Sequence, residues 1–454
     1  MKLNKIGTKE MCQGPLLRSL IAYTVPIILT GVLQLLFNAA DLIVVGRFAD
    51  SNSVGAVGAT GSLTNLIVNL FMGLSVGAGV VVAQGLGARD RRKVHQTVHT
   101  AIPLALISGA ALMVIGIIFS ETFLKMMDTP EEILPLAAVY MRIYFGGMIF
   151  NLLLNFAASI LRAAGDSMTP MIALVTAGVV NVLFNLFFVI VLHMDVAGVA
   201  LATAISQAVA SVVMMIALMR RDDACRFEWR KMGIHRIPLK RILAIGLPTG
   251  IQSSMFSISN VLIQSSINSF GPQSVAGNAA ASNLEGFVYT TMHSVNQAVL
   301  NFSGQNAGAG NFQRIRKIYW NGCLMTVIGG GVLGVLLYLL GEPLLSIYIS
   351  DSPTSIAFGM TRLQYVGLPY FLCGLMEVAQ GAVRGMGISF SPMIISLIGV
   401  CGLRVVWIYT VFEAHRTLGT LFASYMVSWL LVTVAVSVIF FVAVRKQEQL
   451  HKIS

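Results

Sequence analysis

Long apolar runs recur throughout this chain, and they restrict its possible folds more than any other feature. The 454 residues are 56% hydrophobic and 11% charged, and the mean hydropathy is +0.80. About 20 apolar residues in a helix cross a bilayer core, and only helices and closed barrels satisfy their backbone polar groups there. The composition therefore predicts an all-α, multi-pass membrane protein and excludes a soluble globular domain.

Breaks rich in Gly, Pro or charged residues divide the apolar runs into twelve expected spans. We place these spans at residues 18–40, 53–83, 94–118, 133–158, 168–192, 196–219, 242–269, 276–303, 318–340, 356–383, 391–411 and 417–444. Each is long enough to cross the hydrocarbon core as a helix.

Lysines and arginines gather in alternate loops. If both termini are cytoplasmic, the inside segments carry 24 of the 30 basic residues, the outside loops carry three, and three lie within spans. An excess of basic residues in cytoplasmic loops sets the orientation of membrane proteins. We therefore expect a plasma (inner) membrane protein with both termini inside. The net charge of +11 is then explained without a nucleic-acid partner.

One basic segment, residues 220–241, separates six spans from six. It divides the chain into an expected N-lobe (1–219), a cytoplasmic linker (220–241) and a C-lobe (242–454). An even number of spans in each half means that both halves enter the membrane in the same direction. The halves should therefore be a parallel repeat that encloses a central cleft.

The two halves also resemble each other residue by residue. Pro26 matches Pro248 and Asn38 matches Asn260 at an offset of 222. The offset is 221 for Gln84, Gly87 and Ala88, which recur as Gln305, Gly308 and Ala309. An offset that holds through six spans indicates a structural repeat. Parallel repeats are typical of transporters that bind substrate near the membrane midplane.

A carboxylate in the first span, Asp41, is the most informative polar residue. An ionised side chain in a bilayer is costly unless it faces protein, water or a cation, so such residues are functional-site hypotheses. A purely structural alternative is that Asp41 lies at a helix end and pairs with Arg47. The second repeat has apolar or aromatic residues at the positions equivalent to these polar ones, because Asp41 corresponds to Ile263, Asn181 to Leu403 and Asn185 to Trp407.

Two asparagines of the fifth span share one helix face with each other, since Asn181 and Asn185 are four residues apart. At 1.5 Å per residue they lie about 20 and 25 Å above the cytoplasmic end of the span. Asp41 and Thr203 reach a similar depth. We therefore expect the four side chains to lie together, although interhelical hydrogen bonding alone would also explain each amide.

Several short stretches give the chain a resemblance to a known family. They are Pro26 with Asp41-Leu42-Ile43 and Gly46, Gly85-Leu86-Gly87-Ala88-Arg89-Asp90, Leu161-Arg162-Ala163-Ala164-Gly165-Asp166, and Gly304-Gln305-Asn306-Ala307-Gly308-Ala309-Gly310. Together they resemble the multidrug and toxic compound extrusion (MATE) family over nearly the whole chain. The resemblance implies twelve transmembrane helices in two six-helix lobes, arranged in a V. It also implies export of cationic or amphiphilic compounds against inward Na⁺ or H⁺.

The resemblance also assigns a cation site. The family's acidic residue on span 1 and its polar partners on spans 5 and 6 fall on Asp41, Asn181, Asn185 and Thr203, which would ligate Na⁺ if Na⁺ is the coupling ion. Some members carry a second carboxylate where this chain has Asn185. Other members carry an acid on span 7, whereas residues 252–260 contain none.

Two acids of the second half, Glu285 and Glu377, are candidates for substrate binding. They stand among apolar residues, and each could attract a cationic substrate or pair structurally with Arg404 or Arg362. Both interpretations remain open from the sequence. The repeat-related amides Asn38 and Asn260 complete the set of substrate-binding candidates.

The sequence therefore favours a secondary active antiporter that exports cationic or amphiphilic organic compounds and acts as a monomer. No Walker A motif is present, so an ion gradient would have to drive transport and no cofactor is expected. The alternative is a flippase or exporter of lipid-linked or polyprenyl-type substrates, for which a strongly cationic cleft is expected. An enzyme is not expected, because no catalytic constellation of polar residues is apparent.

Overall fold

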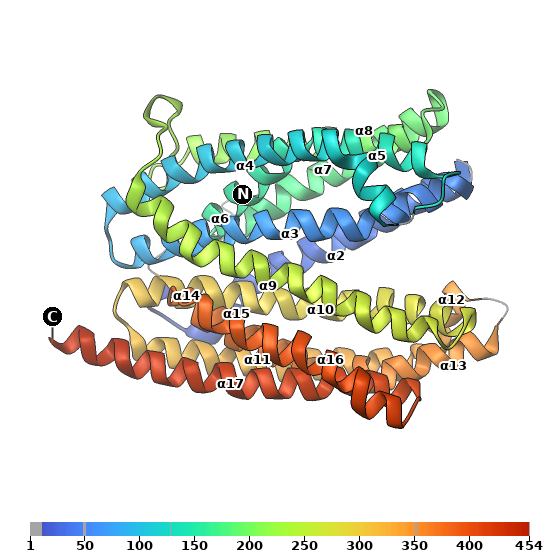
Figure 1. Cartoon of the computed structure of the whole chain (residues 1–454). Helices are drawn as coiled ribbons and strands as arrows, with labels where there is room; N and C mark the ends of the chain where they lie inside the picture. The colour runs from blue at the N-terminus through green and yellow to red at the C-terminus, as the bar shows by residue number, and fades with distance from the viewer. Residues whose placement is uncertain (1–10, 49–50, 128, 350–351, 454) are drawn as a thin grey trace. The chain divides into compact units, whose positions relative to one another are not determined.

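The computed structural model describes residues 11–48, 51–127, 129–349 and 352–453, and every regular element in these ranges is helical (Figure 1). The longer elements are α2 (Leu16–Phe48), α3 (Ser51–Gly87), α4 (Arg91–Met126), α5 (Leu134–Gly146), α6 (Met148–Ala163), α7 (Met168–Leu186), α8 (Asp195–Met219), α9 (Arg236–Asn268), α10 (Pro272–Gly308), α11 (Phe312–Leu339), α12 (Gly341–Tyr348), α13 (Pro353–Arg362), α14 (Tyr370–Gly385), α15 (Phe390–Ser396), α16 (Leu403–Trp407) and α17 (Leu418–Ile453).

The twelve expected spans all fall on these helices. In the described residues, ten segments are long and apolar enough to cross a membrane, and the pair α5 and α6, bent by 47°, makes an eleventh. The remaining expected span lies in α10, which has 37 residues but carries buried polar side chains along much of its length. Helix α10 is therefore long enough to cross a membrane, but its average hydropathy is too low to identify it as a span.

Short π-helical segments interrupt several spans. The segment η1 (Phe187–Val191) follows α7, and η5 (Ile408–Phe412) follows α16 at the corresponding place in the second repeat. Two more, η3 (Leu363–Gly367) and η4 (Leu397–Gly402), lie in the second half. Single π turns widen a helix locally and are frequent at functional sites.

The chain forms two compact units whose limits fall inside helices. Of the described residues, unit 1 comprises 29–250 and unit 2 comprises 11–28 together with 251–453. The beginning of α2 thus belongs to unit 2, and the beginning of α9 belongs to unit 1. Both limits lie two residues after a proline, Pro26 or Pro248. The division into an N-lobe (1–219) and a C-lobe (242–454) that move during transport stays a prediction.

Glycines allow α3 and the beginning of α9 to pack closely within unit 1. A side chain on Gly73 would overlap the backbone of Gly250, and a side chain on Gly77 would overlap that of Ile242. Gly246 also lies against this face. Small residues four apart on both helices permit this backbone approach.

Each unit has its own apolar core. In unit 1 the core joins α4, α5, α6 and α8 through Leu112, Leu124, Ala137, Ala138, Met141, Phe145, Met148, Leu152 and Val196. In unit 2 it joins α10, α11, α12 and η3 through Ala280, Ala281, Leu284, Val288, Leu337, Leu345 and Leu363. Close packing of this kind holds membrane helices together where the hydrophobic effect contributes little.

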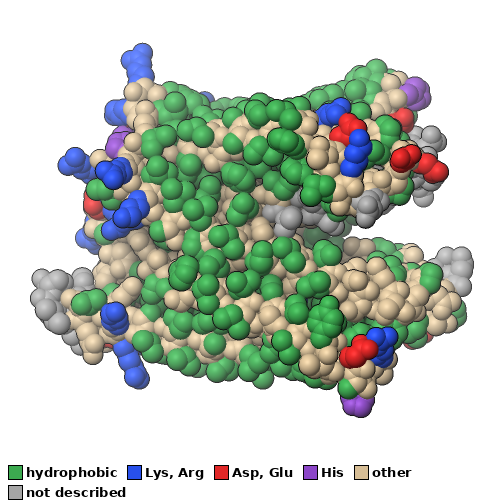
Figure 2. All heavy atoms as spheres, viewed as in Figure 1, with side chains coloured by type: hydrophobic (Ala, Val, Ile, Leu, Met, Phe, Trp, Pro, Cys, Tyr) green, Lys and Arg blue, Asp and Glu red, His purple; other side chains and the backbone are tan. Residues whose placement is uncertain are grey.

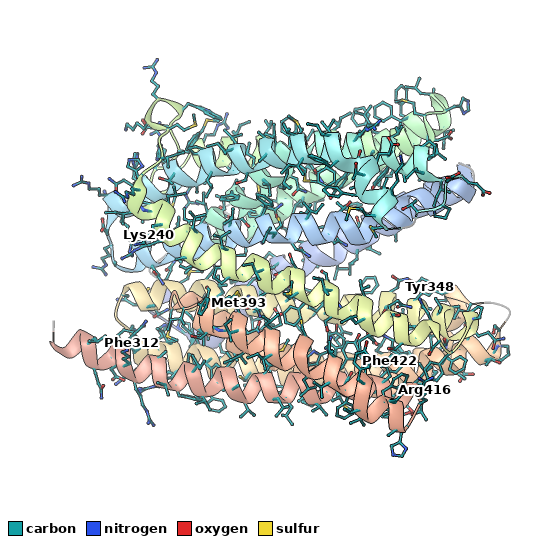
Figure 3. All side chains as sticks on the ribbon, in the orientation of Figure 1. Lys240, Phe312, Tyr348, Met393, Arg416 and Phe422 are labelled. Atoms are coloured by element: carbon teal, nitrogen blue, oxygen red, sulfur yellow. The ribbon has the colours of Figure 1, made fainter. Side chains whose placement is uncertain are left out.

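Apolar side chains cover the middle of each unit's visible face in Figure 2, and most of its Lys and Arg side chains gather at one end. In unit 2, Figure 3 shows Phe312 towards one end, and Tyr348 and Arg416 towards the other. The arrangement fits a chain that crosses the bilayer along the helix axes. Its orientation, with both termini inside, stays a prediction.

The segment between α8 and α9 is packed against α4. The backbone N–H of Glu228 donates to His99 Nε2 at 3.1 Å, and that of His235 donates to Thr100 Oγ1 at 3.0 Å. Cys225 is fully buried, and this burial raises the pKa of its thiol to about 12. The segment is therefore docked, and its cysteine is poorly reactive at neutral pH.

We predict that cysteines placed in two exposed loops will report the orientation. Glu131→Cys, in the loop before α5, should react with a membrane-impermeant maleimide in intact cells, whereas Arg230→Cys should react only after permeabilisation. Wild-type Cys225 should stay unlabelled in both states because it is buried, so it serves as an internal control. Labelling of Arg230→Cys but not Glu131→Cys in intact cells would reverse the orientation.

Candidate functional site

The site in unit 1 depends on close packing of α2 against α7. Phe37 of α2 lies over Gly178 of α7, where a methyl group would overlap its ring. Asp41 follows Phe37 by one helical turn, and Asn181 and Asn185 lie three and seven residues after Gly178 on the same face. Contact between the two helices therefore brings the carboxylate to the two amides.

A continuous series of hydrogen bonds joins the four predicted residues. Asn185 Nδ2 donates to Asp41 Oδ1 and also, at 3.2 Å, to Asn181 Oδ1. Asn181 Nδ2 approaches Thr203 Oγ1 at 3.4 Å, which is long for a hydrogen bond. The hydroxyl of Thr203 donates to its own helix, at Val199 O. The structure thus brings the four side chains together, while their role in cation coupling stays a prediction.

One oxygen of the site has no donor. Asn185 is 1% exposed, and its Oδ1 accepts no hydrogen bond from any group in the described residues. Buried polar atoms nearly always have a partner, so a buried acceptor beside a carboxylate requires an explanation. A cation bound at this oxygen would provide one.

An apolar cluster borders the site on the side away from the linker. It consists of Val44, Val189 and Val199, with Tyr140 packed against it. Each valine lies about one helical turn from a member of the site, namely Asp41, Asn185 and Thr203 respectively. The alternative pairing of Asp41 with Arg47 falls outside the described side chains.

In unit 2, Glu285 forms a buried ion pair with Arg362. The guanidinium donates from Nε to both carboxylate oxygens at 3.1 Å and from Nη2 to Oε2 at 2.8 Å. Its Nη1 donates to Asn278 Oδ1 at 2.6 Å. The centre of the ring of Phe422, labelled in Figure 3, lies 5.5 Å from the guanidinium carbon. Of the two interpretations open for Glu285, these contacts favour the structural pair.

Glu377 has different partners and contacts neither of the arginines considered for it. Asn296 Nδ2 donates to Glu377 Oε2 at 2.6 Å, and His293 Nδ1 lies 3.2 Å from the same oxygen. The expectation that both acids stand among apolar residues is wrong, because Arg362 of α13 binds Glu285, and Asn296 and His293 of α10 contact Glu377. Asparagine and histidine within an expected span were the sequence signal for these contacts.

The two amide candidates, Asn38 and Asn260, are both exposed. Asn38 has no hydrogen bond recorded among the described residues, whereas Asn260 Oδ1 lies 3.4 Å from Arg404 Nη1. Asn260 also lines a cavity in unit 2 with a volume of about 180 Å³. The repeat had indicated that these positions are equivalent, but their surroundings differ.

A buried network in unit 2 went unrecognised in the sequence. Gln252 Nε2 donates to Gln380 Oε1 at 2.9 Å and to Ser396 Oγ at 2.8 Å, and Gln252 Oε1 accepts from Arg384 Nη2 at 2.7 Å. Gln252 opens the segment of span 7 that carries no acid. Neutral amides and one guanidinium occupy this region instead.

These features define a class of protein: a helical, multi-pass membrane transporter made of two repeats, with a polar site inside the first. The MatE family model matches residues 26–187 and again 248–410, which is most of each half. The chain belongs to this family. It is a transporter and not an enzyme, and the predicted all-α membrane fold of two repeats is confirmed.

Three known proteins illustrate the similarity. The probable multidrug resistance protein YoeA of Bacillus subtilis is 28% identical over 408 residues, covering 88% of this chain and 87% of its own. The probable multidrug resistance protein NorM of Thermotoga maritima is 26% identical over 399 residues, covering 86% and 84%. A MATE transporter solved in an outward-facing conformation has a TM-score of 0.90 at 20% identity, covering 99% and 100%.

We predict that Gly178→Ala will disturb the unit 1 site. The added methyl group must displace the Phe37 ring, and overpacking of this kind costs about 1–3 kcal/mol. The melting temperature in detergent should fall, and efflux per molecule should fall with it. Gly146→Ala is the matched control, because nothing lies within 4 Å of its added carbon. Equal behaviour of the two variants would show that the α2–α7 contact is unimportant.

We predict that the Glu285–Arg362 pair is structural. Breaking a buried ion pair leaves one charge uncompensated and costs about 3–5 kcal/mol, whereas replacing both partners can be nearly neutral. Glu285→Gln alone should therefore lower the melting temperature more than Glu285→Gln combined with Arg362→Met. If the double variant is the less stable of the two, the pair does not act as a unit.

Proposed function

We propose that the chain is a secondary active antiporter that exports cationic or amphiphilic organic compounds, driven by inward Na⁺ or H⁺. Family membership supports export of small molecules, since relatives are named probable multidrug resistance proteins and, in Staphylococcus aureus, multidrug export protein MepA. We further propose that it works as a monomer in the plasma membrane.

The observation that carries the coupling proposal is that Asn185 Oδ1 accepts no hydrogen bond in the described residues, although the same amide donates from Nδ2 to the Asp41 carboxylate. Na⁺ is a hard cation, and such cations take carboxylate, amide and hydroxyl oxygens as ligands. Asp41, Asn185, Asn181 and Thr203 supply these oxygens from α2, α7 and α8. With a single carboxylate the site balances one positive charge, which could be Na⁺ or a proton on Asp41.

The alternative, a flippase for lipid-linked or polyprenyl-type substrates, has less support from the charges. It called for several free cationic side chains, but two of the three arginines first placed within spans have acidic partners. Arg142 lies 3.3 Å from Glu121, and Arg362 binds Glu285. Arg404 alone of the three has no carboxylate partner among the described residues.

We predict that Asp41→Asn will abolish gradient-driven export while the protein still folds. Asparagine keeps the size of the side chain but removes its charge and its proton-binding oxygen. In proteoliposomes, uptake of a fluorescent organic cation against its gradient should be lost with either an imposed Na⁺ gradient or an imposed ΔpH. The two gradients, applied separately to wild type, identify the coupling ion.

Asp195→Asn is the matched control, because Asp195 is an exposed carboxylate at the beginning of α8 in the same unit. It should transport as wild type does. Asp41→Asn protein that still concentrates the cation in response to either gradient would refute the coupling role.

A further inference from the structure

The second repeat has a cavity where the first repeat has its carboxylate site. Ile263, the counterpart of Asp41, lines the cavity of about 180 Å³ in unit 2. Around it are amide and hydroxyl side chains, two tyrosines and Arg362; the lining residues used here are Asn260, Gln264, Asn278, Ser282, Tyr370 and Tyr425. None of the described residues that line this cavity carries a carboxylate. The counterpart of the cation site has therefore lost its negative charge.

Arg404 lies beside this cavity, one residue after the counterpart of Asn181. It is 3% exposed, and its guanidinium carbon is 4.0 Å from the centre of the Tyr425 ring. Its Nη1 lies 3.4 Å from Asn260 Oδ1. Asn260 and Tyr425 both line the cavity, so no more than one side chain separates the Arg404 guanidinium from it.

The polar contacts of Arg404 are few and long. Its Nε donates to Ser428 Oγ and its Nη1 to Ser259 Oγ, each at 3.4 Å, whereas good N–H···O bonds are shorter. None of these acceptors is charged. The Tyr425 ring compensates part of the positive charge through a cation–π contact, but a buried guanidinium ordinarily has an anionic partner.

The nearby acids are occupied by other groups. Glu285 is bound by Arg362, and Glu377 by Asn296 and His293. Neither acid is bound by Arg404, whose polar contacts are all with neutral groups. At this place the second repeat thus has a guanidinium among neutral groups, whereas the first repeat has a carboxylate among neutral oxygens.

We propose that this cavity is a binding site for the anionic group, a carboxylate or sulfonate, of an amphiphilic organic compound. The anion replaces Asn260 Oδ1 as the acceptor of Arg404 and receives a second hydrogen bond from the Asn260 amide. Ile263, Tyr370 and Tyr425 provide apolar and aromatic surface for the adjoining part of the compound. The cavity is smaller than the roughly 300–1,000 Å³ of complete ligand sites, so it holds one end of the molecule.

Three probes with one fluorophore separate charge from hydrophobicity. They are dansylglycine, which carries a carboxylate, dansylcadaverine, which carries an ammonium group, and uncharged dansylamide. Their binding is followed by fluorescence on the purified full-length protein in detergent. Wild type should bind dansylglycine more tightly than dansylamide, by about tenfold or more for a buried charge-assisted pair. Equal affinity for these two probes would overturn the proposal.

Two variants then test the named residues. Arg404→Gln should remove the preference for dansylglycine and leave dansylamide binding within about twofold, while Arg404→Lys should keep part of the preference. Asn260→Asp, at an exposed position, should weaken dansylglycine and strengthen dansylcadaverine even if Arg404→Gln fails to fold. Its matched control is Asn268→Asp, the same change at an exposed position of α9 that does not line the cavity, which should leave dansylglycine binding unchanged. Unchanged dansylglycine affinity in Asn260→Asp would overturn the proposal.

This binding site rests on the proposed export function and names one class of compound that would be exported. Its test needs no ion gradient, so Asp41→Asn protein should bind dansylglycine as wild type does. Failure of gradient-driven efflux would count against antiport alone, whereas loss of the charge preference in the binding assay would count against this site alone.

Discussion

Burial of polar groups in a bilayer is the constraint on which this structure depends. Backbone groups are satisfied within helices, so the remaining cost lies with side chains such as Asp41, Glu285, Arg362 and Arg404. Glu285 and Arg362 meet this cost by binding each other in a bidentate arrangement. Asp41 meets only part of it through the Asn185 amide, and Arg404 has only neutral partners in the described residues. Of these four charges, Asp41 and Arg404 are the two for which we propose ligands.

The two repeats share their fold but differ in polarity at one equivalent place. The fifth span of each ends in a π-helical segment, η1 or η5, at matching positions. The first repeat places a carboxylate beside this span, and the second places Ile263 and a guanidinium there. We propose that this divergence lets one scaffold hold a cation in the first repeat and recognise an organic compound in the second. Because the sites lie on separate helices, substitutions can address each of them alone.

Helices α2 and α9 connect the repeats in a way that a simple division of the chain would miss. Each contributes its first part to one unit and the remainder to the other, with the limit just after Pro26 or Pro248. Proline removes a backbone hydrogen bond and allows a helix to bend. The interlocked glycines of α3 and α9 show that the first part of α9 is firmly packed within unit 1.

The sequence by itself determined the helical membrane fold, the repeat and the four residues of the unit 1 site. It could do so because the length of the apolar runs, the distribution of charge and the 222-residue offset between the repeats can be read from the chain without knowing how its helices pack. Depth along a helix follows from its regular rise, so Asp41, Asn181, Asn185 and Thr203 could be placed at one level. The partners of Glu285 and Glu377 could not be chosen in this way. Only the tertiary structure decided that Arg362 reaches Glu285, that Glu377 faces His293 and Asn296, and that Arg404 is left beside a cavity. Those pairings depend on the rotation of each helix about its axis, which packing sets and sequence spacing does not.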